Sequence, residues 1–354
     1  EFKELASVCA GPAVVETFGL PGFHPENRPE AFALSPHQEE VSNQLANEIR
    51  QITNQYMPGD ETSFTIIAFP RPEIGKDFEG IFRDTIALNT LDYEKYQKIQ
   101  QTMIDALDQA SKVHITGRGG NRTDLWVRLH ELKNRDKETN FENCVADVNI
   151  PLGEVFTSPV LAGTKGLLHV ERVYIEEYQF QDLWLRFEDG RVTDYGCGNF
   201  KPQEDWEEQG KKLVKQVILR GHEWLPMGEF AIGTNTTAYA MAEKYQIGDK
   251  LPILIAEKTG PHFAVGDTCY SFSEDTPMYN PDGKEVIARD NEISIQRKTN
   301  PAQAYFSCHT DITVPYSELG DIVAVDEAGK ETALIRQGRF ALPGTEELNE
   351  ALEE

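Results

Sequence analysis

Residues 256–270 of this chain read AEKTGPHFAVGDTCY. They follow an apolar run, Leu251 to Ile255, that predicts a buried strand, and they include the carboxylate of Glu257, the imidazole of His262 and the phenol of Tyr270. The Gly-Pro step at 260–261 excludes a regular helix here, so we expect Glu257 and His262 to come from a strand end and its turn. Alone the pattern is a modest signal, because most glutamates on loops are solvated.

Three other short segments have the same character, with an acid or a histidine among Gly, Pro and apolar residues. An unpaired charge is costly in such surroundings, so each of these groups needs a partner. The segments carry Glu154 in GEVFTSP (153–159), Glu229 in GEFAIG (228–233), and His309 with Asp311 in CHTD (308–311).

Composition and charge exclude several classes of protein. The length of 354 residues suggests two domains or one large one, and an apolar fraction of 39% is ample for a packed core. No stretch approaches 18 consecutive apolar residues, so we expect no membrane span. The formal charge of −25 argues against a nucleic-acid partner and fits a protein that attracts cations or amines.

The five cysteines include no C-x-x-C pair, which argues against a disulfide framework or a zinc ribbon and fits the reducing cytoplasm. The first residue is Glu1 rather than Met, and the opening residues resemble the middle of a domain. We therefore expect an upstream segment, and the absence of a signal peptide says little about location.

The first half of the chain alternates predicted strands and helices. Residues 12–19 and the apolar run 64–69 are predicted strands, the second one buried in an α/β layer. Ser35-Pro36 predicts the start of a helix. The apolar residues of this helix recur at helical spacing and should pack on a sheet. They are Val41, Leu45, Ile49 and Ile52.

A second helix is predicted over residues 93–110, and a strand over 113–116 leads into GRGG (117–120). The glycines could suggest a phosphate-binding loop, but both the Walker template and the dinucleotide fingerprint fail. A hairpin turn before Asp124 is favoured instead.

After about residue 145 the pattern changes to short strands and turns. Residues 166–177 and 183–187 alternate apolar and polar side chains, and Asp189-Gly190 predicts a tight hairpin turn. A helix is predicted over 204–220, with later strands around Ile253, Ile293, Ile322 and Ala333. The fold class is α/β, with an N-terminal α/β domain over residues 1–140 and a β-rich domain over 141–354.

The candidate ligands provide four carboxylates and two imidazoles. A mononuclear catalytic zinc needs three protein ligands and a water, whereas six ligands suit two metal ions about 3.5–4 Å apart. Imidazoles favour zinc, cobalt or manganese over magnesium. His309 and Asp311 would share one face of a strand, because side chains alternate with a period of two. The six residues are Glu154, Glu229, Glu257, His262, His309 and Asp311.

Other interpretations stay open at this point. Glu154 and Glu229 could each be a buried structural acid held by hydrogen bonds. The remaining histidines that we considered are more typical of surface or core positions than of ligands. They are His114, His130, His169 and His222.

Residues 149–159 are similar to the motif N-P-x(2)-E-V-F-T-x-P, with Ile150 inserted in the Asn-Pro step, and residues 228–231 match G-E-x-A. Glu257 precedes H-x-A-x-G (262–266) by five residues, and residues 309–311 match H-x-D. Residues 63–72 and 117–125 are similar to W-T-I-V-A-Y-P-x-P and G-x-x-T-D-L. In this order the motifs resemble those of the aminopeptidase T family of thermophilic-type metalloaminopeptidases, over most of the chain.

The resemblance implies a truncated N-terminal α/β domain, a C-terminal β-rich α+β catalytic domain, and homodimers that enclose the active site. It also implies two divalent ions per chain (zinc, cobalt or manganese) held by the six candidate ligands. Tyr270 would support the tetrahedral intermediate. However, the family's Tyr lies seven residues after the His, where this chain has Cys269, and residues 312–315 differ from the family's F-M-I-G.

We therefore expect a cytoplasmic metalloaminopeptidase that acts on peptides, with Glu229 as the general base. One rival is a dinuclear hydrolase of another amide or ester. Another is a metal-binding dimer without catalytic activity. The sequence leaves open the metal, the preferred N-terminal residue and the contribution of an upstream segment.

Overall fold

The structure is a computed structural model. It describes residues 3–6, 8–9, 11–20, 34–57, 62, 64–145, 149–175, 178–300 and 303–353. Two β-sheets share the main hydrophobic core, and a third, smaller sheet near the N-terminus has a core of its own.

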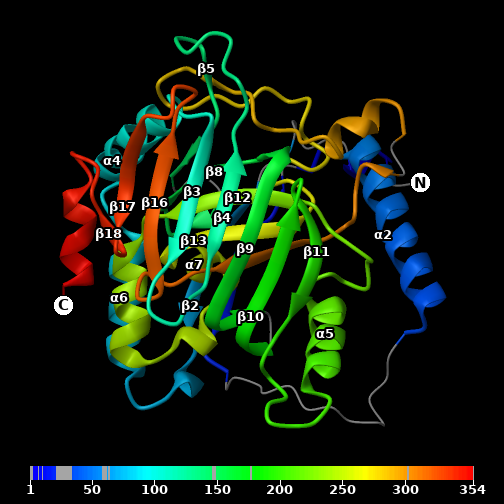
Figure 1. Cartoon of the computed structure of the whole chain (residues 1–354), viewed down its shortest axis with the longest axis horizontal. Coiled ribbons are helices and arrows are strands. Elements are labelled where there is room, and N and C mark those ends of the chain that lie inside the picture. Colours follow the sequence, from blue (N-terminus) through cyan, green and yellow to red (C-terminus); the bar gives the residue numbers. More distant parts are fainter. Residues whose placement is uncertain are drawn as a thin grey trace.

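The largest sheet has eight antiparallel strands in the order β11-β10-β9-β4-β3-β16-β17-β18 (Figure 1). The predicted turn at 189–190 connects β10 to β11, where Asp189 (φ 44°) and Gly190 (φ 66°) are both left-handed, as a two-residue hairpin turn requires. Gly117 ends β3, and Gly119 and Gly120 lie in the turn between the paired strands β3 and β4, as predicted. The strands are β3 (Lys112–Gly117), β4 (Asp124–Arg128), β9 (Val160–Ile175), β10 (Tyr178–Glu188), β11 (Arg191–Gly196), β16 (Leu319–Val325), β17 (Glu331–Arg336) and β18 (Arg339–Phe340).

The second sheet has five antiparallel strands in the order β15-β13-β12-β8-β6. Alternate residues of these strands, including Val155, Phe230, Phe263 and Ile312, are fully buried in the core shared with the large sheet. The strands are β6 (Glu142–Cys144), β8 (Glu154–Thr157), β12 (Met227–Gly233), β13 (Pro261–Gly266) and β15 (His309–Thr313). Two short strands, β5 (Glu138–Thr139) and β14 (Glu285–Val286), pair separately.

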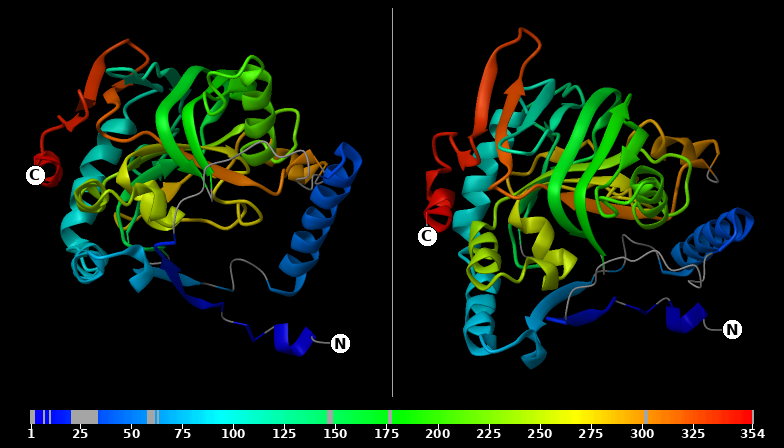
Figure 2. Two further views of the ribbon diagram at one scale, coloured as in Figure 1. Left: turned by 90° about the horizontal axis from the view of Figure 1, so that it is seen from below. Right: turned by 60° about the horizontal axis from the view of Figure 1, so that its bottom comes forward.

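The third sheet is parallel and lies near the N-terminus (Figure 2). It consists of β1 (Ala13–Phe18), β2 (Thr65–Pro70) and β7 (Asn149–Ile150), so both predicted N-terminal strands are confirmed. Phe18 and Ala68 of this sheet pack in one cluster with residues of α3 (Phe78–Asn89), α6 (Thr236–Tyr245) and α7 (Ile253–Ala256). This core connects the N-terminal strands to segments from the second half of the chain.

Two further helices pack on the main core. The helix α4 (Tyr93–Leu107) buries Tyr96, Ile99, Met103 and Leu107, which confirms its predicted apolar face. The helix α5 (Trp206–Val217) lies beside β11 and agrees with the prediction for 204–220. The remaining short helices are α1 (Lys3–Ala6), η2 (Pro72–Ile74), η3 (Gly248–Lys250), η4 (Glu257–Thr259), η5 (Ser294–Lys298) and η7 (Glu346–Leu352).

The helix α2 (Pro36–Tyr56) begins as predicted but does not pack as predicted. Ser35 caps it by accepting a hydrogen bond from Gln38 N, and the Gln38 side chain accepts from Ser35 N. The apolar stripe of α2 was expected to lie on a sheet, yet Val41 is 49%, Leu45 56%, Ile49 54% and Ile52 56% exposed. Figure 2 shows α2 at the edge of the molecule, away from the sheets.

Two predicted strands are wrong. Residues 253–256 form α7, and only Leu254 and Ile255 of its apolar residues are buried, while Ile253 is exposed. A short apolar run fits one face of a helix turn as well as a strand, so periodicity alone could not separate the two. Ile293 precedes the 3₁₀ helix η5 rather than lying in a strand.

The division at residue 140 stays a prediction. The strands β3 and β4, from before residue 140, pair with β16 and β9, from after it. A boundary at this point therefore passes through one continuous sheet.

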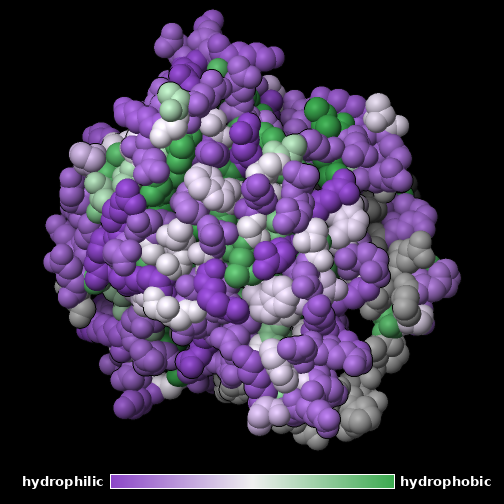
Figure 3. Space-filling view, viewed as in Figure 1, coloured by the Kyte–Doolittle hydropathy of each residue, from purple (hydrophilic) through white to green (hydrophobic). Residues whose placement is uncertain are grey.

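The surface of the molecule is mainly polar, as expected for a chain with many charged residues. The face in Figure 3, which carries the large sheet, is mainly hydrophilic with scattered apolar side chains. Within the described ranges, none of the helices combines the length and the apolar character needed to cross a bilayer.

Candidate metal centre

Five of the six predicted ligands lie on one face of the five-stranded sheet. Glu154 begins β8, Glu229 lies in β12, His262 in β13, and His309 and Asp311 in β15. Side chains alternate along a strand, so the neighbours of these residues point to the opposite face and fill the main core. The sequence alternation therefore separates a polar face from an apolar one.

The strand register aligns these residues in rows. Glu229 is opposite Ala264, and Ala264 is opposite Asp311, so two carboxylates are separated by one methyl side chain. In the same way, His309 is opposite Gly266. Small residues in these rows leave room between the acidic side chains.

The sixth predicted ligand, Glu257, comes from η4 rather than from the strand end that we expected. The helix η4 approaches the sheet at Gly233, where a Cβ would lie 2.6 Å from the carbonyl oxygens of both Lys258 and Gly260. Only glycine allows this approach of two backbones. Gly233 thus lets residues 257–260 close over the polar face.

Both histidines present Nε2 to the carboxylates. His309 Nδ1 lies 2.7 Å from the carbonyl oxygen of Asp267, and His262 Nδ1 lies 3.3 Å from that of Gly260. A carbonyl only accepts, so each Nδ1 carries a hydrogen and each Nε2 faces the cluster. Metal-binding histidines are typically oriented in this way.

Glu229 lies between the two histidines. Its Oε1 is 3.7 Å from His262 Nε2, and its Oε2 is 3.0 Å from His309 Nε2. Two triads of ligand atoms, each within 4.8 Å of one another, share this carboxylate: Glu154–Glu229–His262 and Glu229–Cys269–His309. Asp311 Oδ1 is 3.4 Å from His309 Nε2, on the side of the second triad.

A lysine balances part of this buried negative charge. Lys258 is fully buried, contacts Glu154 Oε1, and its Nζ is 2.9 Å from Glu257 Oε1. Burial alone would raise the pKa of Glu154, but Lys258 and His262 outweigh it and bring the pKa to about 2. Burial raises the pKa of Glu257 to about 7, and the nearby carboxylates of Glu154 and Asp311 add to the effect.

The remaining charges favour a further cation. Burial opposes ionisation of Glu229, yet hydrogen bonds with His262 and His309 hold its pKa well below the usual range. Burial also opposes a positive charge on His262, but Glu154 and Glu229 raise its pKa well above the usual value. A field that attracts a proton to Nε2 attracts a metal cation there for the same electrostatic reason.

Two buried carboxylate oxygens of this cluster, Glu154 Oε2 and Asp311 Oδ1, have no hydrogen-bond donor among the described residues. Such oxygens are costly to bury without a partner. One belongs to the first triad and the other borders the second, so the donor set of this cluster fits a divalent metal.

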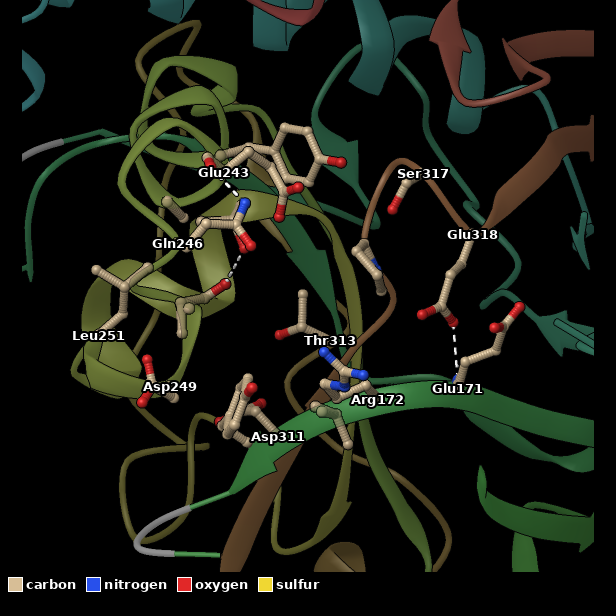
Figure 4. A pocket seen from close by; sticks show the side chains of 18 of the residues that line it. Glu171, Arg172, Glu243, Gln246, Asp249, Leu251, Asp311, Thr313, Ser317 and Glu318 are labelled. Atoms are coloured by element: carbon tan, nitrogen blue, oxygen red, sulfur yellow. Dashed lines mark hydrogen bonds between the residues drawn. The ribbon is translucent and has the colours of Figure 1, made fainter. Parts of the chain in front are cut away.

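A cavity of about 510 Å³ opens beside this cluster. Asp311 and Thr313 of β15 line it, as do Ala256 and Thr259, which flank Glu257 and Lys258. Figure 4 shows Glu243 of α6 and Gln246, which follows that helix, on one side and Glu171 and Glu318 on the other. Its charged lining residues are mostly acidic: Glu171, Asp182, Glu243, Asp249, Asp311 and Glu318, with Arg172 as the basic side chain.

Tyr270 and Cys269 differ from what the resemblance implied. The Tyr270 phenol is buried and donates a hydrogen bond to Glu142 Oε2 at 2.6 Å, and its ring packs near Phe156. The residue before it, Cys269, joins the second triad instead. The catalytic role expected of Tyr270 stays a prediction.

The four histidines that we set aside have partners elsewhere. His114 stacks on Trp126 and pairs with Asp124, and His169 Nδ1 accepts from Arg122 N. His130 and His222 lie within hydrogen-bond distance of the backbone carbonyls of Ser158 and Phe306.

Sequence reasoning did not single out Lys258 as part of the cluster. The available signal was a lysine placed between the apolar run 251–255 and the Gly-Pro step.

A family model described as thermophilic metalloprotease (M29) matches residues 27–340. Among solved structures, wild-type AmpT from Thermus thermophilus is similar over 96% of this chain and 78% of that chain, with 17% sequence identity and a TM-score of 0.60. This likeness shows a shared fold. The 2,5-dihydroxypyridine dioxygenase from Pseudomonas putida KT2440 is similar over 97% of this chain and 95% of that chain, with 15% identity and a TM-score of 0.45. No curated protein sequence matches the chain.

Proposed function

Since this chain belongs to the thermophilic metalloprotease (M29) family and is therefore a metallopeptidase, we propose that it is an aminopeptidase with two divalent metal ions per chain. The observation that carries the proposal is the position of Glu229, whose two carboxylate oxygens face different triads. A carboxylate with two oxygens is suited to bridge two ions.

The ligands on the two sides of Glu229 would be divided between the ions. Glu154, Glu229 and His262 would hold one ion, while Glu229, His309 and Asp311 would hold the other. Glu257, from η4 above the polar face of the sheet, would add a further carboxylate to the ligands of the two ions. The imidazoles suit zinc, cobalt or manganese. When bound, such ions acidify water and polarise a carbonyl oxygen.

Within this site Glu229 moves the proton. We assign it the role of general base, which takes a proton from the attacking water and returns it to the leaving amine. Its pKa lies well below the usual range, so it is ionised at neutral pH. Burial at 4% exposure also keeps bulk water away from its oxygens.

The acidic cavity would hold the free α-amine of the peptide. A protonated amine is attracted to carboxylates such as Glu171, Glu243 and Asp249, and the net charge of −25 attracts it from a distance. An internal peptide bond carries no such amine. The charge of the cavity therefore supports removal of N-terminal residues rather than internal cleavage.

We propose a structural role for Tyr270, since its phenol donates its hydrogen bond to Glu142. The use of cysteine in this chain, five residues without a C-x-x-C pair, fits the reducing cytoplasm, where we place the enzyme. We also propose that it forms a homodimer, because α2 exposes a stripe of four apolar residues.

The test is hydrolysis of a panel of aminoacyl p-nitroanilides by metal-stripped protein, titrated with zinc, cobalt and manganese. We expect turnover to appear with about two metals per chain and to fall by roughly 10²–10⁴-fold in Glu229→Gln. Glu208→Gln, on the exposed side of α5, is the matched control.

The other outcomes separate the rivals. Metal binding without turnover of any anilide, but with turnover of other amides or esters, would replace the aminopeptidase assignment by another dinuclear hydrolase. Metal binding with no hydrolysis at all would favour a metal-binding dimer. A chain that binds no metal would overturn the assignment of the site.

A further inference from the structure

Cys269 lies at the metal centre, although its neighbour Tyr270 was the residue expected there. Its Sγ, a carboxylate oxygen of Glu229 and a ring nitrogen of His309 lie within 4.8 Å of one another. The Cys269 side chain is exposed, while Tyr270 is buried against Phe156. The two adjacent residues therefore point in different directions, and the thiol is the one that joins the ligands.

The backbone before Cys269 is fixed against the start of β15. Gly266 has φ +116°, and a Cβ there would lie 2.1 Å from the Cys308 carbonyl oxygen, so the two segments touch. Asp267 N donates to Cys308 O at 2.7 Å, and the Asp267 carboxylate accepts from Phe306 N at 2.6 Å and Ser307 N at 2.8 Å. The Asp267 carbonyl also accepts from His309 Nδ1. This network holds Cys269 beside His309 before any ligand binds.

A second observation points to a cation at this place. Asp311 Oδ1 is buried, has no hydrogen-bond donor within the described ranges, and lies 3.4 Å from His309 Nε2. Its side chain is 8% exposed. Glu229, His309, Asp311 and Cys269 together offer two carboxylates, an imidazole and a thiol, which is a complete set for a four-coordinate ion.

We propose that Cys269 is a thiolate ligand of the ion held by Glu229, His309 and Asp311, and that this half of the site selects zinc over manganese. A thiolate is a soft ligand, which zinc and cobalt accept readily and manganese does not. The inference rests on the proposed pair of metal ions but not on peptide hydrolysis. It makes Cys269, in the segment that follows β13, a metal ligand, whereas the resemblance implied a tyrosine phenol at this point of the site.

The experiment is cobalt titration of the metal-stripped protein, followed by absorption spectroscopy. A thiolate bound to Co²⁺ gives a near-ultraviolet charge-transfer band, which oxygen and nitrogen ligands do not give. We expect the band in the wild type and its loss in Cys269→Ser. Cys308→Ser is the matched control, because Cys308 is adjacent to His309 in sequence but outside both triads. The control should keep the band.

Affinity gives a second measurement. We expect Cys269→Ser to bind zinc at least ~10-fold more weakly, since even indirect partners of metal ligands contribute that much. The affinity for manganese should change less, so the ratio of zinc affinity to manganese affinity should be smaller in the variant than in the wild type. Zinc should also protect the Cys269 thiol of the wild type from alkylation, which peptide mass spectrometry measures without any variant.

The outcomes are independent of turnover. An unchanged cobalt band in Cys269→Ser, or alkylation of Cys269 at the same rate with and without zinc, would overturn the inference. A band without hydrolysis of any peptide substrate would leave the inference in place and overturn the proposed function. Hydrolysis of peptide substrates without the cobalt band would support the proposed function and overturn the assignment of Cys269 as a ligand.

Discussion

The buried phenol of Tyr270 provides a test at the scale of single residues. Its hydroxyl donates to Glu142 at 2.6 Å, so we expect Tyr270→Phe to lower the free energy of unfolding by about 1–2 kcal/mol. A donor to the reacting oxygen would instead contribute roughly 10²–10³ in kcat. We expect kcat to fall by far less than that, as measured on the best aminoacyl anilide.

Tyr305→Phe is the matched control for this change. The Tyr305 hydroxyl also donates to a glutamate, Glu274, at 3.0 Å, and both residues are buried outside the metal triads. The two variants should lose similar stability. A loss of 10²-fold or more in kcat for Tyr270→Phe alone would restore the phenol to the catalytic role that the resemblance implied.

Asp108 provides a second test, on the pH dependence of stability. It is 2% exposed, its Oδ1 accepts from Asn140 N at 2.9 Å, and its Oδ2 has no hydrogen-bond donor in the part of the chain that the structure describes. Burial raises its pKa from 3.8 to about 6. Between these values the folded state keeps a proton that the unfolded state has lost, so this group lowers the free energy of unfolding as pH rises through the window.

Asp108→Asn should remove this loss, because the amide is neutral and its oxygen still accepts from Asn140. Relative to the wild type, we expect the variant to gain up to about 3 kcal/mol between roughly pH 4 and pH 7. Urea unfolding of both proteins at the two pH values measures this, and all other titrating groups cancel in the comparison. A difference that is independent of pH would contradict the raised pKa.

At the scale of elements, Gly233 controls how closely η4 approaches the sheet. In Gly233→Ala the new methyl group would lie 2.6 Å from two backbone oxygens, so η4 has to move. We expect a loss of about 1–3 kcal/mol in stability. Zinc affinity should fall as well, because Glu257 and Lys258 move with η4.

Gly248→Ala is the control, because a Cβ there meets only Tyr174 at 3.8 Å. Thermal unfolding and zinc titration of both variants give the comparison. Equal stability and equal zinc affinity in the two variants would show that the approach of η4 does not shape the metal centre.

The elements that the sequence predicts correctly are those that depend on interactions between neighbouring residues. Ser35-Pro36 marks the start of α2, and Asp189-Gly190 marks a turn, because caps and tight turns depend on a few adjacent residues. The ligand segments were recognisable since a charge among apolar residues needs a partner. By contrast, the apolar run before Glu257 predicts a strand where the structure has the helix α7, because so short a run carries too little periodicity to distinguish a strand from a helix turn.

Long-range contacts account for the rest of the site. The ion pair of Lys258 with Glu154 joins residues 104 positions apart, and no local pattern reveals it. Likewise, the choice between Cys269 and Tyr270 depends on how the chain leaves β13. That path is set by Gly266 and by the hydrogen bonds of Asp267 to residues 306–308.

At the scale of the whole molecule, the helix α2 exposes a row of apolar side chains to solvent. Val41, Leu45, Ile49 and Ile52 follow one face of the helix, and each is about half exposed in the single chain. A stripe of this kind is costly to leave in water and is typical of an interface. In the homodimer that we propose, this stripe packs against a second copy of the chain.

The prediction is that Leu45→Lys combined with Ile49→Lys converts a dimer to a monomer, because two charges cannot be buried against an apolar partner. Gln44→Lys with Thr53→Lys is the matched control, since it adds the same charge at exposed positions beside the stripe. Sedimentation velocity over a range of protein concentrations measures the outcome, and circular dichroism checks that α2 is retained. A wild type that stays monomeric throughout would contradict the homodimer. A dimer that survives the double substitution would place the interface on another face, and the exposed stripe of α2 would then need a different partner.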